Sequence, residues 1–119
     1  MDGWIIKINA FGDTVWTRQV GSQGLGAGQD FITCVILNND NELVFTGNRY
    51  QFPYGRQVWF LKYQPNGDML TERKIGGNAE NNGNEIILNS DGSYMIIGDR
   101  ESFGTQKRGK HVWLLRLST

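Results

Sequence analysis

The sequence predicts an all-β protein made of antiparallel four-stranded repeat units. Three observations carry this prediction: an imperfect internal repeat of about 55 residues, short apolar runs bounded by Asn, Asp and Gly, and the lack of a sustained helical period. The chain of 119 residues has 16 glycines and only 2 prolines, and with its many asparagines this composition favours tight turns. Its length is enough for one domain with a modest core.

The repeat is clearest in a four-residue segment that begins with tryptophan. Trp4–Lys7 recurs 55 residues later as Trp59–Lys62, and after a further 54 residues as Trp113–Arg116. The copies differ by insertions of about four and about three residues in predicted loops, as expected of a structural repeat. Further positions recur at offsets of 55 or 51 residues: Gly12 with Gly67, Asp13 with Asp68, Val20–Gly21 with Ile75–Gly76, Asp40 with Asp91, Gly47 with Gly98 and Arg49 with Arg100.

The strands are predicted from runs of β-branched and aromatic residues that end at Asn, Asp and Gly clusters. Such clusters at 38–41, 65–68 and 90–92 are typical of hairpin turns. The side chains of Asp40 and Asp91 are expected to bond to the backbone of their turns. Nine strands are predicted, at 4–9, 14–20, 30–37, 42–48, 58–63, 69–75, 84–89, 93–98 and 112–117.

Residues 1–119 are predicted to form a single repeat domain. One complete unit is expected at 30–76, between a partial unit at 1–22 and another at 83–119. The pattern therefore starts and ends on the strand that carries the repeated tryptophan.

The repeated residues are expected to have structural roles. Trp4, Trp59 and Trp113 recur in register, which predicts that each packs between adjacent sheets. Arg49 and Arg100 recur just past the end of a strand, where we expect a salt bridge or a contact with a backbone carbonyl.

Four segments form a recognisable pattern: Asp91–Gly98, Val112–Leu117 and the glycine-bearing pairs Gly67-Asp68 and Gly76-Gly77. Together they resemble bacterial β-propeller repeats, of the WD-like and PQQ-like kind found in secreted or surface proteins. The resemblance implies propeller-like blades, about two of them in this chain. Because propellers usually have about four to eight blades, the resemblance implies completion by oligomerisation, a homo-oligomer of three or four copies closing a ring. A piece of a longer secreted propeller and a self-contained sandwich of two sheets are the alternatives.

Composition and net charge limit the kinds of partner that are expected for this chain. Twelve basic and twelve acidic residues give a formal net charge of zero, which argues against nucleic acid or an anionic membrane as the main partner. No apolar run is long enough for membrane insertion and no signal peptide is apparent, so a cytoplasmic protein or a mature secreted or surface segment is expected. The single cysteine, Cys34, and the single histidine, His111, predict no disulfide, no metal site and no cofactor.

The candidate binding residues lie in the predicted loops at one end of the sheets, where the copies differ. These loops are 21–29, 49–57, 76–83 and 99–111. Binding residues concentrate on such loops, and aromatic and Arg residues are enriched at recognition hot spots. The alternative interpretation is that the aromatic side chains close over the sheet ends and the charges are solvated. The candidates are Arg49, Tyr50, Phe52, Tyr54 and Arg56 in one loop, and Phe103, Arg108 and His111 in another.

The leading functional hypothesis is a non-catalytic binding or scaffold module that recognises a protein or a carbohydrate. The alternative is an enzyme, for example one that processes glycosides with Asp30, Glu80 or Glu85, or a cofactor binder whose site forms between subunits. Residues 24–28 do not match a dinucleotide loop, because position 29, where the third glycine of that motif would stand, is Gln and no helix is predicted to follow. Residues 38–42 lack the glycine and glutamate of a calcium loop. Cys34 lies in an apolar run, which indicates a buried free thiol rather than a nucleophile.

Overall fold

The computed structural model describes residues 2–21, 29–51, 55–77, 79–102 and 110–118, which form strands and turns and no helix. Every strand pair in this part of the chain is antiparallel, so the prediction of an all-β, antiparallel protein is confirmed. The described strands are β1 (Gly3–Ile8), β2 (Thr14–Val20), β3 (Phe31–Leu37), β4 (Leu43–Gln51), β5 (Gly55–Tyr63), β6 (Met69–Ile75), β7 (Ala79–Leu88), β8 (Tyr94–Ser102) and β9 (Lys110–Leu117).

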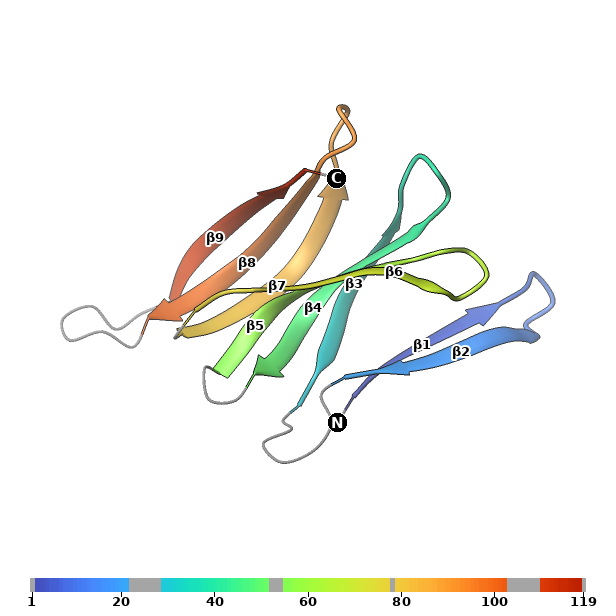
Figure 1. Cartoon of the computed structure of the whole chain (residues 1–119), viewed down its shortest axis with the longest axis horizontal. Helices are drawn as coiled ribbons and strands as arrows, with labels where there is room; N and C mark the ends of the chain where they lie inside the picture. The colour runs from blue at the N-terminus through green and yellow to red at the C-terminus, as the bar shows by residue number, and fades with distance from the viewer. Residues whose placement is uncertain (1, 22–28, 52–54, 78, 103–109, 119) are drawn as a thin grey trace.

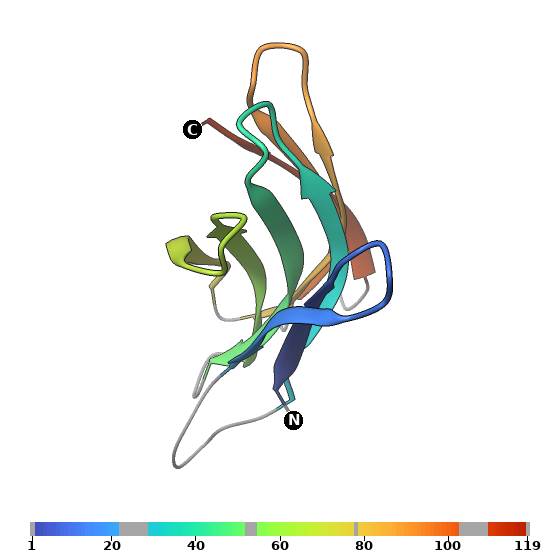
Figure 2. The ribbon, with the colours of Figure 1, turned by 90° about the vertical axis from the view of Figure 1, so that its right-hand side faces the viewer.

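The strands form three sheets that stack in one direction (Figure 1). The β1–β2 hairpin is the first layer, the four-stranded sheet β3-β4-β5-β6 is the second, and the three-stranded sheet β7-β8-β9 is the third. Seen from the hairpin end, β1 and β2 lie in front of the central sheet (Figure 2). The described strands thus form an open stack, and none of the three sheets closes into a barrel.

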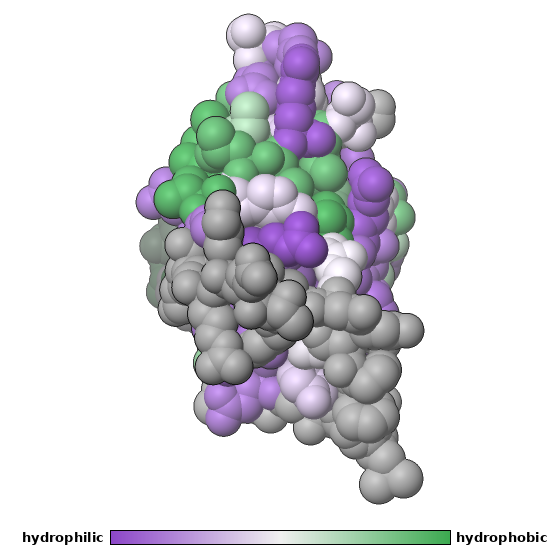
Figure 3. Space-filling view, turned by 90° about the vertical axis from the view of Figure 1, so that its left-hand side faces the viewer, coloured by the Kyte–Doolittle hydropathy of each residue, from purple (hydrophilic) through white to green (hydrophobic). Residues whose placement is uncertain are grey.

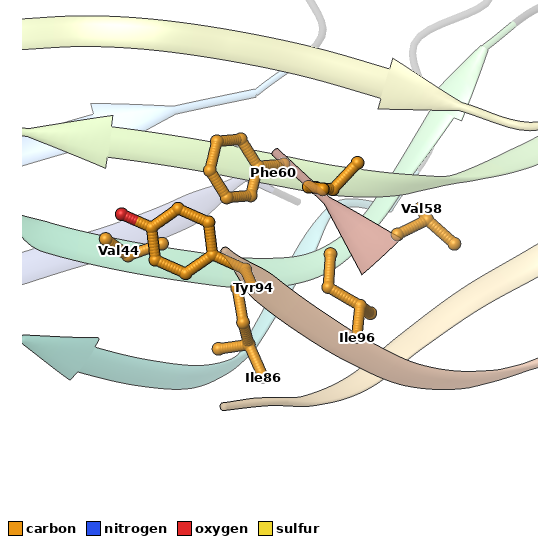
Figure 4. Packing of buried hydrophobic residues seen from close by; sticks show 7 residues of the cluster. Val44, Val58, Phe60, Ile86, Tyr94 and Ile96 are labelled. Carbon is orange, nitrogen blue, oxygen red and sulfur yellow. The ribbon is translucent and has the colours of Figure 1, made fainter. Parts of the chain in front are cut away.

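The central and third sheets share the larger core (Figure 4). Val44, Val58 and Phe60 of the central sheet pack against Tyr94 and Ile96 of the third sheet. The rings of Phe60 and Tyr94 lie 5.5 Å apart and tilted. Ile86 and Leu117 complete the buried cluster, and Cys34 packs at its margin, as its apolar neighbours predict.

A second core joins the hairpin to the opposite face of the central sheet. Trp59, Leu61 and Tyr63 of β5 are buried there under Ile5 of β1. Because successive side chains of a strand point to opposite faces, β4 and β5 are buried on both sides. This explains why adjacent apolar residues occur in both strands, at 43–45 in β4 and at 58–61 in β5.

The hairpin turns at Asn9, Asn38, Gln64 and Asn89 share one hydrogen-bond pattern. In each, the amide N–H of that residue donates to the carbonyl four residues on, and its carbonyl accepts from the amide three residues on. The residue three positions on has a positive φ in all four turns, at Gly12, Asn41, Gly67 and Gly92. This geometry is the three-residue hairpin loop closed by a G1 bulge, which favours Gly or Asn at that position.

The side chain that stabilises the β3–β4 turn is Asn38 and not the expected Asp40. Asn38 Oδ1 accepts from the backbone N–H groups of Asp40 and Glu42, and the Asp40 carboxylate is exposed. In the β7–β8 turn the expectation is correct, because Asp91 Oδ1 accepts from the backbone N–H of Ser93.

Bulges recur at corresponding places and explain two repeated glycines. The β3–β4 register shifts between Ile32 and Cys34, and the β7–β8 register shifts 51 residues later, between Gly83 and Glu85. Each shift brings a carbonyl oxygen of the neighbouring strand against a glycine. A Cβ on Gly47 would overlap with the Phe31 carbonyl, and a Cβ on Gly98 would overlap with the Asn82 carbonyl. These two positions therefore require glycine for close backbone approach.

Several strands are longer than predicted at the end opposite the turns. β4 continues to Gln51 and β5 starts at Gly55, so most of the predicted loop 49–57 is strand. Likewise, β7 starts at Ala79, β8 continues to Ser102 and β9 starts at Lys110, which shortens the predicted loops 76–83 and 99–111. The prediction was wrong because these polar ends lack an apolar pattern, whereas cross-strand pairing continues through them.

The repeated tryptophans do not share one environment. Trp59 is 1% exposed and Trp113 is partly buried against the core, but Trp4 is 68% exposed. The expectation that Trp4 packs between sheets is wrong, because its face of the hairpin has no described layer outside it.

Candidate functional site

The predicted site residues that the structure describes lie on strands rather than in loops. Arg49 and Tyr50 are in β4, Arg56 is in β5 and His111 is in β9. Four further candidates, Phe52, Tyr54, Phe103 and Arg108, lie outside the described residues. The expected cluster of loop residues is thus replaced, where it is described, by cross-strand pairs at the ends of two hairpins.

The Arg49 side chain is held in place by contacts with three other residues. Its guanidinium forms a salt bridge with Glu72 of β6, lies 5.5 Å over the Trp59 ring, and donates to the Gly21 carbonyl at 3.3 Å. Only 17% of its side chain is exposed. These contacts are the salt bridge and carbonyl contact expected for this position.

Tyr50 and Arg56 face each other across the β4–β5 ladder. The Arg56 guanidinium lies 5.8 Å over the Phe31 ring and 4.0 Å from the Glu80 carboxylate, and 40% of its side chain is exposed. The Tyr50 backbone N–H donates to Asp30 Oδ1 at 2.9 Å. This pair gives the end of the central sheet an aromatic and cationic surface that is half-buried and held by neighbours.

Arg100 and His111 form the corresponding cross-strand pair on β8 and β9, and both are exposed. The Arg100 guanidinium lies 5.3 Å over the Trp113 ring. The stack repeats that of Arg49 on Trp59, although the described residues supply no counterpart of Glu72.

The three carboxylates proposed for glycoside chemistry have different environments. Asp30 is buried and bonded to the Tyr50 amide, Glu80 is paired with Arg56, and Glu85 is exposed on β7. Within the described ranges no three His, Cys, Asp or Glu side chains come together as they would at a metal site.

A small polar cleft of about 140 Å³ lies at the turn end, between the β3–β4 and β7–β8 turns. Two of its charged side chains are paired, because Lys62 Nζ lies 3.8 Å from Glu42 Oε1. Asn38 Nδ2 donates to Glu42 Oε1 at 2.8 Å and to the Tyr94 hydroxyl at 3.1 Å. These contacts tie the turn to the third sheet and are fully accounted for by the fold.

The surfaces that sequence reasoning missed are the two outer faces of the stack. At the hairpin end, Trp4, Ile6 and Ile8 point outward with 68%, 46% and 59% of their surface exposed. Trp4 and Ile6 also line an open groove of about 350 Å³ against Ile32, Val35 and other residues of the central sheet. The signal was present in the repeat, since Trp4, Ile6 and Ile8 correspond to the buried Trp59, Leu61 and Tyr63.

At the other end, the outer face of the third sheet is also apolar. Val112 is 80% exposed, Leu114 60%, Ile87 48% and Ile97 38%. Figure 3 views the β8–β9 end and shows hydrophobic residues gathered into one patch with hydrophilic side chains around it. Exposed apolar groups gathered in this way mark interaction sites.

Comparison with known protein-family models found no match, and neither did comparison with curated protein sequences. In the part of the chain that the structure describes, no helix has the length and apolar character needed to cross a bilayer.

Proposed function

We propose that this chain is a non-catalytic binding and scaffold module of propeller-like blades, whose copies assemble head to tail. The observation that carries the proposal is the apolar character of both outer faces of the stack. Burial of such faces in an assembly is favoured by the hydrophobic effect, at roughly 25 cal/mol per Å².

The two exposed faces are of different kinds, which we call the tryptophan face and the reverse face. In the central sheet the tryptophan face carries Trp59, Leu61 and Tyr63, and the reverse face carries Val58 and Phe60. Inside the chain, a reverse face packs on a tryptophan face at both layer contacts. The hairpin covers Trp59 with Ile5, and the central sheet covers the side of the third sheet that carries Trp113.

Two faces remain exposed at the ends of the stack, one tryptophan face and one reverse face. The hairpin exposes its tryptophan face, with Trp4, Ile6 and Ile8, and the third sheet exposes its reverse face, with Val112 and Leu114. Packing the second on the first repeats the contact that the chain already makes twice. Such a contact joins unlike surfaces, so it generates a ring when the rotation closes.

Size-exclusion chromatography with light scattering, over a concentration series, tests the assembly. We expect the parent chain to form a closed oligomer and Trp4→Asp or Leu114→Asp each to prevent it, because a buried unpaired carboxylate is costly. Asn39→Asp, which adds the same charge to an exposed turn, is the matched control and leaves the oligomer unchanged.

Mixing the two face variants distinguishes head-to-tail packing from a symmetric contact. Each variant retains one intact face, so an equimolar mixture is expected to form a dimer that grows no further. A parent chain that stays monomeric to about 100 μM, well above micromolar affinities, would contradict the proposal. Circular dichroism of the variants shows that they remain folded.

The Tyr50–Arg56 pair supports a second function for the same module, recognition of a carbohydrate or protein ligand at the polar end. The supporting observation is an arginine held over Phe31 with 40% of its side chain exposed, beside an aromatic residue. A glycan array is a direct probe for the carbohydrate. Tyr50→Ser and Arg56→Ala are expected to abolish retention of any glycan bound by the parent, whereas Arg73→Ala on β6 retains it. Unchanged retention of the glycan by both variants would show that this surface is not the binding site.

A further inference from the structure

The outer edge of β9 is an unpaired strand edge at the end of the third sheet. In the described part of the chain β9 pairs with β8 alone, whereas its counterpart β5 pairs with β4 on one side and β6 on the other. An unpaired edge presents a row of backbone N–H and C=O groups to an incoming strand. The edge is also distinct from the two outer faces, because it lies in the plane of the sheet.

In the central sheet, the strand on that side supplies one essential side chain. Glu72 of β6 forms the salt bridge with Arg49 and accepts a hydrogen bond from the Trp59 indole N–H at 3.0 Å. Arg49 in turn lies 5.5 Å over the Trp59 ring. One carboxylate thus joins the cation to the indole on which it stacks.

The third sheet repeats this arrangement without the carboxylate. Gly98 opposes Trp113 as Gly47 opposes Trp59, and Arg100 lies 5.3 Å over the Trp113 ring. Over the ranges that the structure describes, no carboxylate pairs with Arg100, and the Trp113 indole N–H has no acceptor. A cation and an indole donor are therefore held in place beside an open strand edge.

We propose that the outer edge of β9 binds an extended acidic strand whose carboxylate bridges Arg100 and Trp113. The register follows from the central sheet, where Glu72 lies opposite Leu61. The position that corresponds to Leu61 in β9 is Leu115, so the carboxylate of the bound strand lies opposite Leu115. Backbone pairing supplies the affinity and the carboxylate sets the register.

Three strands of this chain, β9, β2 and β6, are excluded as occupants of the edge. β9 itself carries no Asp or Glu, so two β9 edges paired with each other would bring no carboxylate to Arg100. In β2 the residue at the corresponding position, opposite Ile6, is Thr17, which has no charge. β6 carries the acid but is already paired with β5. The occupant is therefore an acidic segment of another polypeptide.

A synthetic peptide with the sequence of residues 68–76 is the natural probe, because it contains β6 and its Glu72. Fluorescence anisotropy of the labelled peptide, titrated with the full chain, measures binding. A matched peptide with Glu72→Gln and a chain with Arg100→Gln should each bind about tenfold more weakly, as expected for loss of a charge-assisted hydrogen bond. Hydrogen exchange locates the peptide, and amides of Lys110–Leu117 should become protected.

Three results would overturn the proposal. The first is no binding at peptide concentrations up to about 1 mM, the weak end of measurable affinity. The second is equal binding of the Glu72→Gln peptide, which would show that the carboxylate has no role. The third is loss of protection in β6 with no change in β9, which would mean that the peptide only exchanges with β6. None of these results depends on the head-to-tail assembly, which uses other surfaces.

Discussion

The central sheet and the β1–β2 hairpin place the same residues in opposite environments. Trp59 and Trp4 occupy the same position in their strand pairs, opposite Lys74 in β6 and Gln19 in β2. Yet Trp59 is 1% exposed and Trp4 is 68% exposed. The difference comes from the layers: the central sheet is covered on both sides, and the hairpin on one. An apolar strand face thus indicates that burial under another layer is favoured. Whether the same chain supplies that layer depends on the arrangement of the sheets.

The largest expected effect is the contrast between the two tryptophans. Trp59→Ala should lower the free energy of unfolding by about 3–5 kcal/mol, because a large buried side chain is replaced by a cavity. Trp4→Ala should change it by about 0.5 kcal/mol or less, since the side chain is exposed. Denaturant unfolding at a protein concentration too low for self-association measures both. A Trp4→Ala loss as large as that of Trp59→Ala would show that Trp4 is buried within the chain.

The next effect concerns the two glycines at the bulges. Gly47→Ala and Gly98→Ala should each cost about 1–3 kcal/mol, because the new methyl group overlaps with a backbone carbonyl that cannot move aside cheaply. Gly77→Ala is the matched control, since the nearest atom to its Cβ is the end of the Arg100 side chain at 3.9 Å. Thermal unfolding of the three variants tests this order. An equal loss of stability in Gly77→Ala would show that the close approach of a carbonyl oxygen is not the cause.

A smaller effect separates the two arginine–tryptophan stacks. Glu72→Gln should destabilise the chain by about 1–2 kcal/mol, because Arg49 and the Trp59 indole lose a charged acceptor in a partly buried site. Arg100→Gln should have almost no effect on the free chain, since Arg100 pairs with no described carboxylate. Denaturant unfolding measures both variants. Equal losses would mean that Arg100 already has an acidic partner.

The smallest effect is a pH response confined to one turn. Hydrogen bonds from the Ser93 hydroxyl and amide, with a contribution from Arg116, hold the pKa of Asp91 below its ordinary value. A group with a depressed pKa in the folded state stabilises the fold above its unfolded-state pKa, and that contribution is lost as pH falls through the folded pKa. The β7–β8 turn should therefore loosen in acid, because its Ser93 amide is held by the Asp91 carboxylate, whereas the corresponding amide of the β3–β4 turn is held by the neutral side-chain oxygen of Asn38.

The amide chemical shift of Ser93, followed between about pH 6 and pH 2, tests the response of the β7–β8 turn around the ordinary carboxyl range. Asp91→Asn should remove the response of Ser93. A Ser93 titration midpoint at or above the ordinary aspartate value would contradict the predicted direction of the shift.

The candidate site was only partly predictable. The sequence placed Tyr50 and Arg56 together, and the structure makes them direct cross-strand neighbours. It also indicated a structural role for Arg49, which pairs with Glu72. It did not reveal that these residues lie on strands, because the ends of β4 and β5 lack the alternation of apolar side chains. Backbone pairing with the neighbouring strand carries the ladder through such polar ends.

By itself, the sequence determined the strands, their antiparallel hairpins and the turn residues, because these depend on neighbours within a few positions. Asn38 and Gly67 are examples, since each stabilises a turn through contacts close in sequence or through its own backbone conformation. Only the tertiary structure decided which apolar faces are covered. The burial of Trp59 and the exposure of Trp4 depend on layers contributed by distant parts of the chain, and the same local pattern is compatible with both.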